Sequence, residues 1–279
     1  MSRTLYVSDL DGTLLSTDSR ISECSAATIS RLSDKGALIT VATARTPATV
    51  VPLLSQTRTT PPAVVMTGCA YWLRGDECFR DPHFLPAGDL GKALDFCNRH
   101  DVQPFVYVMS DDRMSLDVYH SALRLNKAEE SFYLERSNLP LKRFHLCTPA
   151  PQRAATHTML LYAMGEEKGI RAAAEAFEAC SECSVCCYPD VFNPRIWNFE
   201  VFPPGISKAS AVDELKKESG ADRLVVFGDS LNDLTMFAVA DVAVAVGNAL
   251  PEVKAAADVV IEANYTDSVA RFIAEDFSE

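Results

Sequence analysis

The sequence predicts an α/β protein with a parallel-sheet core and an inserted α/β domain. Short apolar runs alternate with helical patterns along the chain, which is typical of parallel sheets whose strands are joined by helices. From about His83 the pattern becomes more polar and irregular, and Pro203-Pro204-Gly205 is typical of a hinge back to the first pattern. We therefore expect a discontinuous core, 1–82 with 204–279, interrupted by a domain at 83–203.

The first part of the core is expected to contain three short buried strands and two helices. The strands are 5–7, 37–42 and 64–66, and the helices are 22–35 and one that begins at Thr46 and Pro47. Gly36 follows the first helix, at a position where glycine commonly ends a helix in a left-handed conformation. Thr46 and Pro47 suit the N-cap and the first turn of the second helix.

The inserted domain and the second part of the core are expected to continue the α/β pattern. In the inserted domain we expect helices at 89–100 and 166–179, strands at 104–109, 158–163, 184–188 and 198–202, and an irregular polar stretch up to residue 151. In the returning core we expect helices at 207–219, 231–240 and 251–257, and strands at 224–227, 242–246 and 259–261.

The composition and charge of the chain limit the classes of partner. With 48% hydrophobic and 23% charged residues among 279, the chain is expected to be an ordinary soluble globular protein. Its 26 Lys and Arg against 38 Asp and Glu give a formal charge of −12, and such an acidic surface disfavours nucleic acid and anionic lipid. We expect a small-molecule partner, and a monomer or a weak homo-oligomer.

The N-terminus and the cysteines favour a cytoplasmic location. No signal peptide is evident, and no apolar run approaches the length of a membrane span. Nine cysteines, an odd number, argue against a disulfide framework. The run Cys180-x-x-Cys183-x-x-Cys186-Cys187 partly resembles an iron–sulfur pattern but lacks the further Cys and Pro, so we expect these cysteines to pack rather than to bind a metal.

Four polar groups lie at the ends of predicted core strands or at the start of a helix. Asp9 and Asp11 follow the first strand, Thr43 and Arg45 follow the second, Asp229 to Asp233 follow a later one, and Lys208 starts a helix. Ligands of open α/β sheets bind outside the carboxyl ends of the strands, so we expect these groups to converge on one site. Asp9 and Asp11 are two residues apart and should leave an extended strand on the same side.

The chemistry of these groups points to a metal ion and a phosphate. Carboxylates this close repel one another strongly unless a divalent cation lies among them. The four aspartates offer oxygen ligands with no His or Cys nearby, which favours Mg²⁺. Lys208 in a first helical turn opposes the helix dipole, and a phosphate bound there would remove the conflict. With the Thr43 hydroxyl as a further donor, the set favours phosphoryl transfer through an aspartyl-phosphate.

The polar motifs as a set resemble those of a known family. Asp9-Leu10-Asp11-Gly12-Thr13-Leu14 resembles the first motif of the haloacid dehalogenase superfamily. Thr43, Lys208 and Gly228-Asp229-Ser230-Leu231-Asn232-Asp233 match its second, third and fourth motifs in order, and Gly247-Asn248-Ala249 with Pro251-Glu252-Val253-Lys254 and Ala257-Asp258 is typical of the Cof-like branch. The resemblance implies a Rossmann-like parallel-sheet core with an inserted α/β cap of type 2B.

The resemblance also implies a role for each matching residue. Asp9 would be the nucleophile and a Mg²⁺ ligand, Asp11 would be the general acid and then the base with its backbone carbonyl on the metal, and Asp229 would complete the protein ligands. Thr43 and Lys208 would hold the phosphoryl group, Asn232 would help to bind the substrate, and Asp233 would support the site.

Three departures from the family pattern bear on specificity more than on chemistry. Ala44 and Ala209 stand where the family usually has Gly, and Thr67 stands where its Asn-Gly-Ala begins with Asn. Arg45 is compatible with a salt bridge as well as with a role at the site.

The function implied by the resemblance is a Mg²⁺-dependent phosphatase for small soluble phosphomonoesters, such as sugar, polyol or cofactor phosphates. Two alternatives stay open at this point. One is a phosphomutase or phosphotransferase of the same superfamily, and the other is a non-catalytic phosphate-sensing module.

Overall fold

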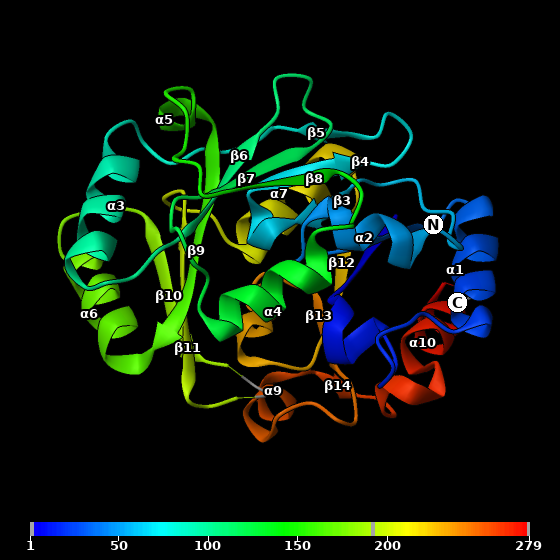
Figure 1. Ribbon diagram of the computed structural model, residues 1–279. Helices are drawn as coiled ribbons and strands as arrows, with labels where there is room; N and C mark the ends of the chain where they lie inside the picture. Colours follow the sequence, from blue (N-terminus) through cyan, green and yellow to red (C-terminus); the bar gives the residue numbers. More distant parts are fainter. Residues whose placement is uncertain (1–2, 191–192, 278–279) are drawn as a thin grey trace. The chain divides into compact units, whose positions relative to one another are not determined.

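The computed structural model describes residues 3–190 and 193–277 (Figure 1). The chain divides into two compact units: Met1–Glu77 with Ser207–Glu279, here called the first unit, and Cys78–Ile206, the second unit. The expected boundaries at 82/83 and 203/204 both fall a few residues inside the second unit. The α/β fold class is confirmed, whereas the division of labour between a core and a cap stays a prediction.

The first unit is built on a five-stranded parallel sheet. Its order is β14 (Val259–Val260), β13 (Val242–Ala245), β12 (Arg223–Gly228), β1 (Thr4–Ser8) and β2 (Leu38–Val41). β1 lies between β12 and β2 and is almost wholly buried, which explains the apolar residues Leu5, Tyr6 and Val7 at its centre. Beyond β2, Ala42 bridges Val64 of β3 (Ala63–Val65), and β3 pairs antiparallel with β4 (Ala70–Leu73).

Helices cover this sheet on both sides (Figure 1). On one side α1 (Glu23–Asp34) packs against α10 (Ser268–Asp276), close to α2 (Pro47–Leu54). On the other side lies α7 (Lys208–Ser219), which contacts β1 and α8 (Leu234–Phe237). α9 (Pro251–Ala256) packs on β13.

The ends of these helices follow the expected local chemistry. The Ser22 side chain accepts a hydrogen bond from the Ser25 amide at 2.9 Å at the start of α1, and Gly36 follows the helix with a φ of +95°. Thr46 is the N-cap of α2, although its side chain makes no capping hydrogen bond. Ser207 caps α7 through the Ser210 amide at 3.0 Å, which makes Lys208 the first residue of that helix.

The second unit is built on a six-stranded sheet. Its order is β10 (Ser184–Pro189), β11 (Ile196–Phe202), β9 (Thr158–Glu166), β6 (Phe105–Met109), β7 (Leu116–His120) and β8 (Lys142–Leu146). Neighbouring strands run antiparallel except β7 and β8, which are parallel. The sheet of the second unit is therefore mostly antiparallel, whereas that of the first unit is parallel.

Helices lie on both faces of the second sheet as well. Val106 and Leu161 belong to the apolar core formed with α3 (Asp89–Arg99) and α6 (Glu167–Glu178). Phe105 and Tyr162, the sequence neighbours of Val106 and Leu161, contact the Phe132 ring of α4 (Lys127–Arg136) at ring-centroid distances of 5.1 and 5.0 Å. Because adjacent residues of a strand point to opposite faces, α4 lies across the sheet from α3 and α6.

Several expected elements differ from those observed. The stretch before residue 151 is not irregular, because it contains β7, α4 and β8. The Asn126 side chain accepts from the Glu129 amide at 3.0 Å and the Glu129 carboxylate accepts from the Asn126 amide at 2.7 Å, a capping box that the spacing Asn126-x-x-Glu129 could have indicated. The elements β4, β5 (Cys78–Arg80), α5 (Ala154–His157) and α10 were not expected.

The helix expected at 231–240 is present but shorter, and its first turn is a 3₁₀ helix. Leu231–Asp233 forms this 3₁₀ turn and continues directly into α8, Leu234–Phe237. Turn hydrogen bonds follow as far as Ala240, and the Asp241 amide then donates to the Leu224 carbonyl of β12 at 2.9 Å, just before β13. Tertiary pairing therefore overrides the local helical pattern.

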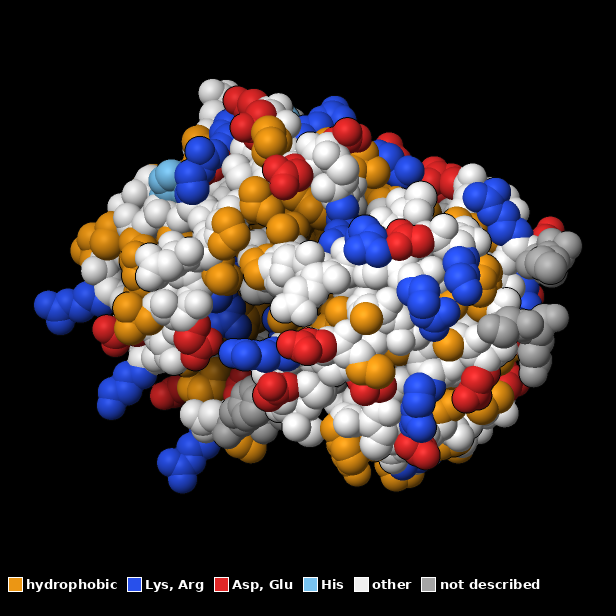
Figure 2. Space-filling view, turned by 90° about the vertical axis from the view of Figure 1, so that its right-hand side faces the viewer, with side chains coloured by type: hydrophobic (Ala, Val, Ile, Leu, Met, Phe, Trp, Pro, Cys, Tyr) orange, Lys and Arg blue, Asp and Glu red, His pale blue; other side chains and the backbone are white. Residues whose placement is uncertain are grey.

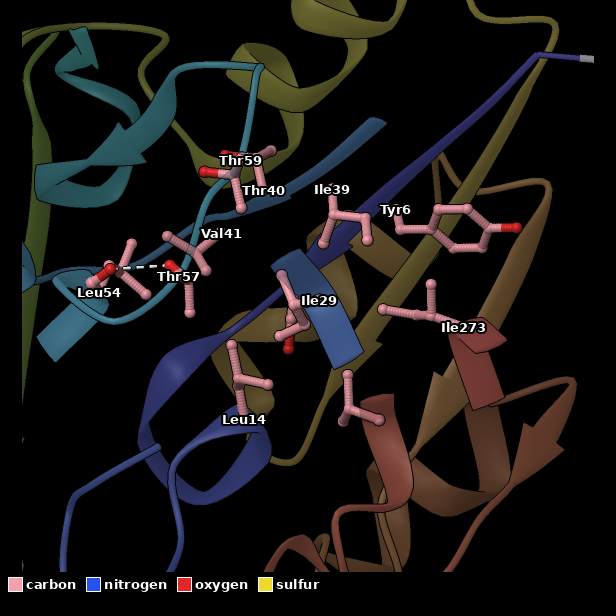
Figure 3. Close-up of a pocket in the computed structure, with 12 residues that line it drawn as sticks. Tyr6, Leu14, Ile29, Ile39, Thr40, Val41, Leu54, Thr57, Thr59 and Ile273 are labelled. Atoms are coloured by element: carbon pink, nitrogen blue, oxygen red, sulfur yellow. Dashed lines mark hydrogen bonds between the residues drawn. The ribbon is translucent and has the colours of Figure 1, made fainter. Parts of the chain in front are cut away.

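A small apolar void lies between the first sheet and α1, α2 and α10 (Figure 3). Tyr6, Ile29, Ile39, Leu54 and Ile273 are among the residues that line it. Its volume is about 10 Å³, at the lower limit for one ordered water, and an apolar lining keeps such a space dry. The void therefore marks a place where this core is not fully packed.

Filling the void should stabilise the first unit. Val269, a buried residue of α10, also lines it, and Val269→Ile should raise the free energy of unfolding by about 0.5–1 kcal/mol. Thermal denaturation measures the effect. The same change at Val260, which is exposed on β14, is the control and should leave the melting temperature unchanged. A lower melting temperature for Val269→Ile would mean that the space cannot accept a methyl group.

Candidate active site

The site lies where parallel strands of the first unit end. Asp9 follows β1, and its amide donates a hydrogen bond to the Phe227 carbonyl of the adjacent strand β12 at 3.0 Å. Asp229 follows the end of the same strand, β12. Since parallel neighbours present their carboxyl ends at one edge of the sheet, two residues far apart in the sequence come together.

Three carboxylates and one ammonium group form the centre of the site. Oxygens of Asp9, Asp229 and Asp233 all lie within 4.8 Å of one another. Lys208 is 2% exposed, and its Nζ donates to Asp9 Oδ1 at 2.5 Å and to Asp233 Oδ1 at 2.9 Å. Lys208 is the first residue of α7, where the helix dipole is unfavourable for a positive charge. The two carboxylates bound to Lys208 offset this unfavourable interaction.

Burial and crowding shift the pKa values of this cluster. Burial raises the pKa of Asp9; Lys208 opposes this shift, whereas repulsion from Asp233 adds to it. The pKa of Asp229 is raised to about 6, mainly by burial, while a hydrogen bond from the Thr13 hydroxyl at 3.0 Å lowers it. The pKa of Lys208 is raised, because the two carboxylates outweigh its own burial. The cluster thus carries more negative charge than Lys208 neutralises.

Asp233 is the member of the cluster that is fully engaged by the protein. Its Oδ1 accepts from Lys208, and its Oδ2 accepts from the amides of Asp229 and Ser230 at 3.0 and 3.1 Å. A Cβ at Gly228 would lie 2.6 Å from the Asp233 Cβ, so only glycine allows this approach. Asp233 therefore holds Lys208 and the loop that carries Asp229.

Asp11 lies outside the group formed by the oxygens of Asp9, Asp229 and Asp233. β1 ends at Ser8, so the alternation of an extended strand does not continue to Asp11, and Gly12 turns the chain with a φ of +78°. The Asp11 side chain is 52% exposed and forms a two-pronged ion pair with Arg45, at 2.6 and 2.7 Å. The salt-bridge interpretation of Arg45 is therefore correct, and its partner is a candidate catalytic residue.

The other expected site residues occupy different positions. Thr43 is buried at the end of β2, where its amide donates to the Val64 carbonyl at 3.0 Å and its hydroxyl accepts from the Arg45 amide at 3.2 Å. Asn232 is exposed, and its side-chain oxygen accepts from the Ser230 hydroxyl at 2.8 Å. The structure therefore joins Thr43 to Arg45 and leaves Asn232 at the surface of the Asp229–Asp233 loop.

Two contributors to the site had no role assigned from the sequence. Thr13 donates to Asp229, and Gly12 leaves the space that the other Asp229 oxygen occupies, because a Cβ at Gly12 would overlap Asp229 Oδ2. Both residues lie in the first motif, so their position beside Asp9 and Asp11 was the available signal.

The Cys180–Cys187 run is the other set of metal-ligating residue types that the sequence brings close together. Among residues 3–190 and 193–277, only the aspartate cluster groups three or more metal-ligating side chains, so the Cys180–Cys187 run is not such a group. Cys183 is buried and its thiol donates to Asp89 Oδ2 at 3.5 Å. Within the same ranges, no helix combines the length and apolar character needed to cross a membrane. On the face drawn in Figure 2, the coloured basic and acidic side chains are interspersed.

Comparisons with known proteins identify the family. The sequence profile of the haloacid dehalogenase-like hydrolases matches residues 6–273. The chain is 27% identical to the 5-amino-6-(5-phospho-D-ribitylamino)uracil phosphatase YitU of Bacillus subtilis, over 98% of this chain and 97% of that protein. It is 25% identical to the pyridoxal phosphate phosphatase YbhA of Escherichia coli, over 98% of both chains.

A solved structure agrees with this likeness. The fold is similar to that of BT4131, described as a sugar phosphatase of HAD subclass IIB, with a TM-score of 0.71, 20% identity and 99% of each chain covered. The family profile confirms the family resemblance, and the solved structure agrees in fold. The chain belongs to the haloacid dehalogenase-like hydrolases and is a phosphoric monoester hydrolase of that family.

Proposed function

We propose that this phosphatase hydrolyses small phosphorylated metabolites with Mg²⁺, by way of a phosphoryl group carried on Asp9. The observation that carries the proposal is the buried Asp9–Lys208 contact at the end of β1, with Asp229 beside it. A carboxylate held close to an ammonium group at a strand end is suited to attack phosphorus, because the cation offsets the charge of the incoming phosphate.

The residues present fit a magnesium ion. Asp9 and Asp229 would hold it together with the Asp11 carbonyl, since Asp233 already accepts hydrogen bonds on both oxygens. Burial, with added repulsion from neighbouring carboxylates, raises the pKa values of Asp9 and Asp229, and a divalent cation beside them would offset that repulsion. When bound, the ion supplies charge that offsets repulsion between these carboxylates and the phosphoryl oxygens.

The first half of the proposed reaction forms the phosphoenzyme. An Asp9 oxygen forms a bond to phosphorus while the bond from phosphorus to the ester oxygen breaks. Asp11 gives its proton to the leaving alkoxide. Lys208 and the Thr43 hydroxyl hold the phosphoryl group during the transfer, which their places near Asp9 and at the end of β2 support.

The second half restores the enzyme. A water oxygen forms a bond to phosphorus, the bond between phosphorus and Asp9 breaks, and one proton of the water passes to Asp11. The products are inorganic phosphate and the Asp9 carboxylate. Asp233 acts indirectly in both halves, through its contact with Lys208.

The names of the relatives support a substrate class. A ribityl phosphate, a sugar phosphate and pyridoxal phosphate appear in the names of the similar proteins, which supports a sugar, polyol or cofactor phosphate as substrate. We assign substrate selection to the inserted domain at 83–203. We also propose that the protein is cytoplasmic. Release of phosphate from a panel of such esters with Mg²⁺ tests the class, and product analysis with a hexose phosphate separates hydrolysis from transfer to a second hydroxyl.

Removal of Mg²⁺ should abolish turnover, and the affinity for Mg²⁺ should fall with pH. Because the pKa of Asp229 is raised to about 6 and that of Asp9 is also raised, protons compete with the ion below neutrality. Titration calorimetry at about pH 5.5 and about pH 8 should show tighter binding at the higher pH. Full activity in excess chelator would contradict the metal assignment.

The same shifts predict how the metal-free protein responds to pH. A carboxyl whose pKa is raised in the folded state binds its proton more tightly there than in the unfolded chain, so protonation stabilises the folded protein. The metal-free protein should therefore lose stability as pH rises from the ordinary pKa of aspartate through about 6. Mg²⁺ should remove this loss. Melting temperatures measured with and without Mg²⁺ across this pH range test the prediction. If the melting temperature changes with pH equally in both conditions, the assignment of these carboxylates as Mg²⁺ ligands is contradicted.

A further inference from the structure

Arg45 holds both carboxylate oxygens of Asp11. Its Nε donates to Asp11 Oδ2 at 2.7 Å and its terminal nitrogen donates to Oδ1 at 2.6 Å. The Arg45 side chain is only 28% exposed, whereas that of Asp11 is 52% exposed. The more buried arginine therefore fixes the direction of the more exposed carboxylate.

The backbone of Arg45 is itself fastened on both sides. Its amide donates to the Thr43 hydroxyl at 3.2 Å, and its carbonyl accepts from the Met66 amide at 3.0 Å. Arg45 is thus attached to the ends of two neighbouring strands, β2 and β3. Asp11 lies beside Gly12, in a turn with a positive φ, where an unpaired side chain would be free to rotate.

A two-pronged contact does more than neutralise charge. The planar guanidinium fixes the plane of the carboxylate as well as its position, which a lysine ammonium does not. With both oxygens accepting hydrogen bonds, Asp11 is held as an acceptor. An oriented acceptor is what the second half of the proposed reaction requires, because Asp11 then takes a proton from water. The first half of the reaction instead requires Asp11 to donate a proton to the leaving group. A good leaving group such as p-nitrophenolate leaves without that proton, so its release does not depend on Asp11.

We propose that Arg45 is a positioning residue that orients the Asp11 carboxylate for hydrolysis of the phosphoenzyme. This inference rests on the proposed function, since it assigns the base of that reaction to Asp11. Loss of the two-pronged contact between Arg45 and Asp11, here called the fork, should slow the step in which water attacks phosphorus and the bond between phosphorus and Asp9 breaks. The step in which Asp9 is phosphorylated by p-nitrophenyl phosphate should keep its rate.

The test compares Arg45→Met and Arg45→Lys with the unmodified protein in rapid-quench experiments on p-nitrophenyl phosphate and Mg²⁺. For Arg45→Met we expect a burst of about one nitrophenolate per active site and then turnover about 10- to 100-fold slower than normal. Acid-quenched samples should contain the labelled phosphoenzyme. Arg45→Lys should also show a burst, because an ammonium group cannot form the fork.

Arg58→Met is the matched control. Arg58 makes the same two-pronged contact with Asp34, at 3.2 and 2.5 Å, but on the exposed surface of the first unit. This variant should behave as the unmodified protein in every phase. Melting curves establish that each variant is folded, and Arg45→Lys carries the test if Arg45→Met does not fold.

Two results would overturn the inference. If Arg45→Met slows the first turnover as much as later ones and weakens inhibition by inorganic phosphate, Arg45 binds the phosphoryl group directly. If both Arg45 variants show normal kinetics, the fork has no part in the reaction. Asp9→Asn distinguishes these failures from a failure of the proposed function: an unchanged phosphoenzyme signal in that variant would refute the assignment of Asp9 itself.

Discussion

Asp9→Asn should abolish hydrolysis of every phosphomonoester and leave no phosphoenzyme. Asparagine keeps the size of the side chain and one oxygen that can accept from Lys208, but it lacks the charge and the nucleophilicity of a carboxylate. Removal of a nucleophile acts on the scale of about 10⁴-fold or more in turnover. Phosphate release and trapping of a labelled phosphoryl group measure the two losses.

The same variant should not lose stability near neutral pH. Burial raises the pKa of Asp9, so its ionised form is less favourable in the folded protein than in the unfolded chain. Asparagine removes that cost, while Lys208 keeps its contact with Asp233 at 2.9 Å. A melting temperature equal to or above normal, together with no activity, is the expected pair of results. Asp34→Asn on the surface is the control, and a catalytically competent Asp9→Asn would contradict the assignment.

Lys208→Met should destabilise the protein as well as inactivate it. Removing the ammonium leaves Asp9 and Asp233 buried without their cation, and breaking a buried ion pair from one side costs about 3–5 kcal/mol. Denaturant unfolding measures this loss. It should be largest above neutrality and shrink as pH falls, because a protonated carboxyl needs no counterion.

Lys217→Met provides the comparison within the same helix. Lys217 pairs with Asp213 at 2.6 Å on the exposed side of α7, where an ion pair contributes little. Its loss should change neither stability nor turnover appreciably. If Lys208→Met were as stable as Lys217→Met at high pH, the buried carboxylates would not depend on Lys208 for compensation.

Much of the site was predictable because its residues lie at the ends of recognisable elements. Asp9, Thr43 and Asp229 each follow an apolar run that forms a buried parallel strand, and Lys208 follows a serine that caps a helix. The carboxyl ends of parallel neighbours meet, so their convergence follows from the fold class.

The unpredicted features depend on conformations that no local pattern encodes. Asp11 lies beyond the end of β1 and beside the positive φ at Gly12, and its pairing with Arg45 needs the ends of β1 and β2 to lie side by side. The short α8 is set by the pairing of Asp241 with Leu224. These are tertiary effects, unlike the capping box at Asn126, whose residue spacing is a local signal.

The parallel pairing of β1 with β12 has a consequence for the growing polypeptide. Leu5, Tyr6 and Val7 pair with residues 224–226 of β12, so one side of β1 has no partner strand until residues 224–226 have left the ribosome. The second unit is continuous in sequence, Cys78–Ile206, and has an apolar core of its own. Domains fold as units during synthesis, so this middle segment can fold first, and Asp9 meets Lys208 and Asp229 only after residue 229 has left the ribosome. An apolar strand that waits this long is a site for chaperone binding or aggregation.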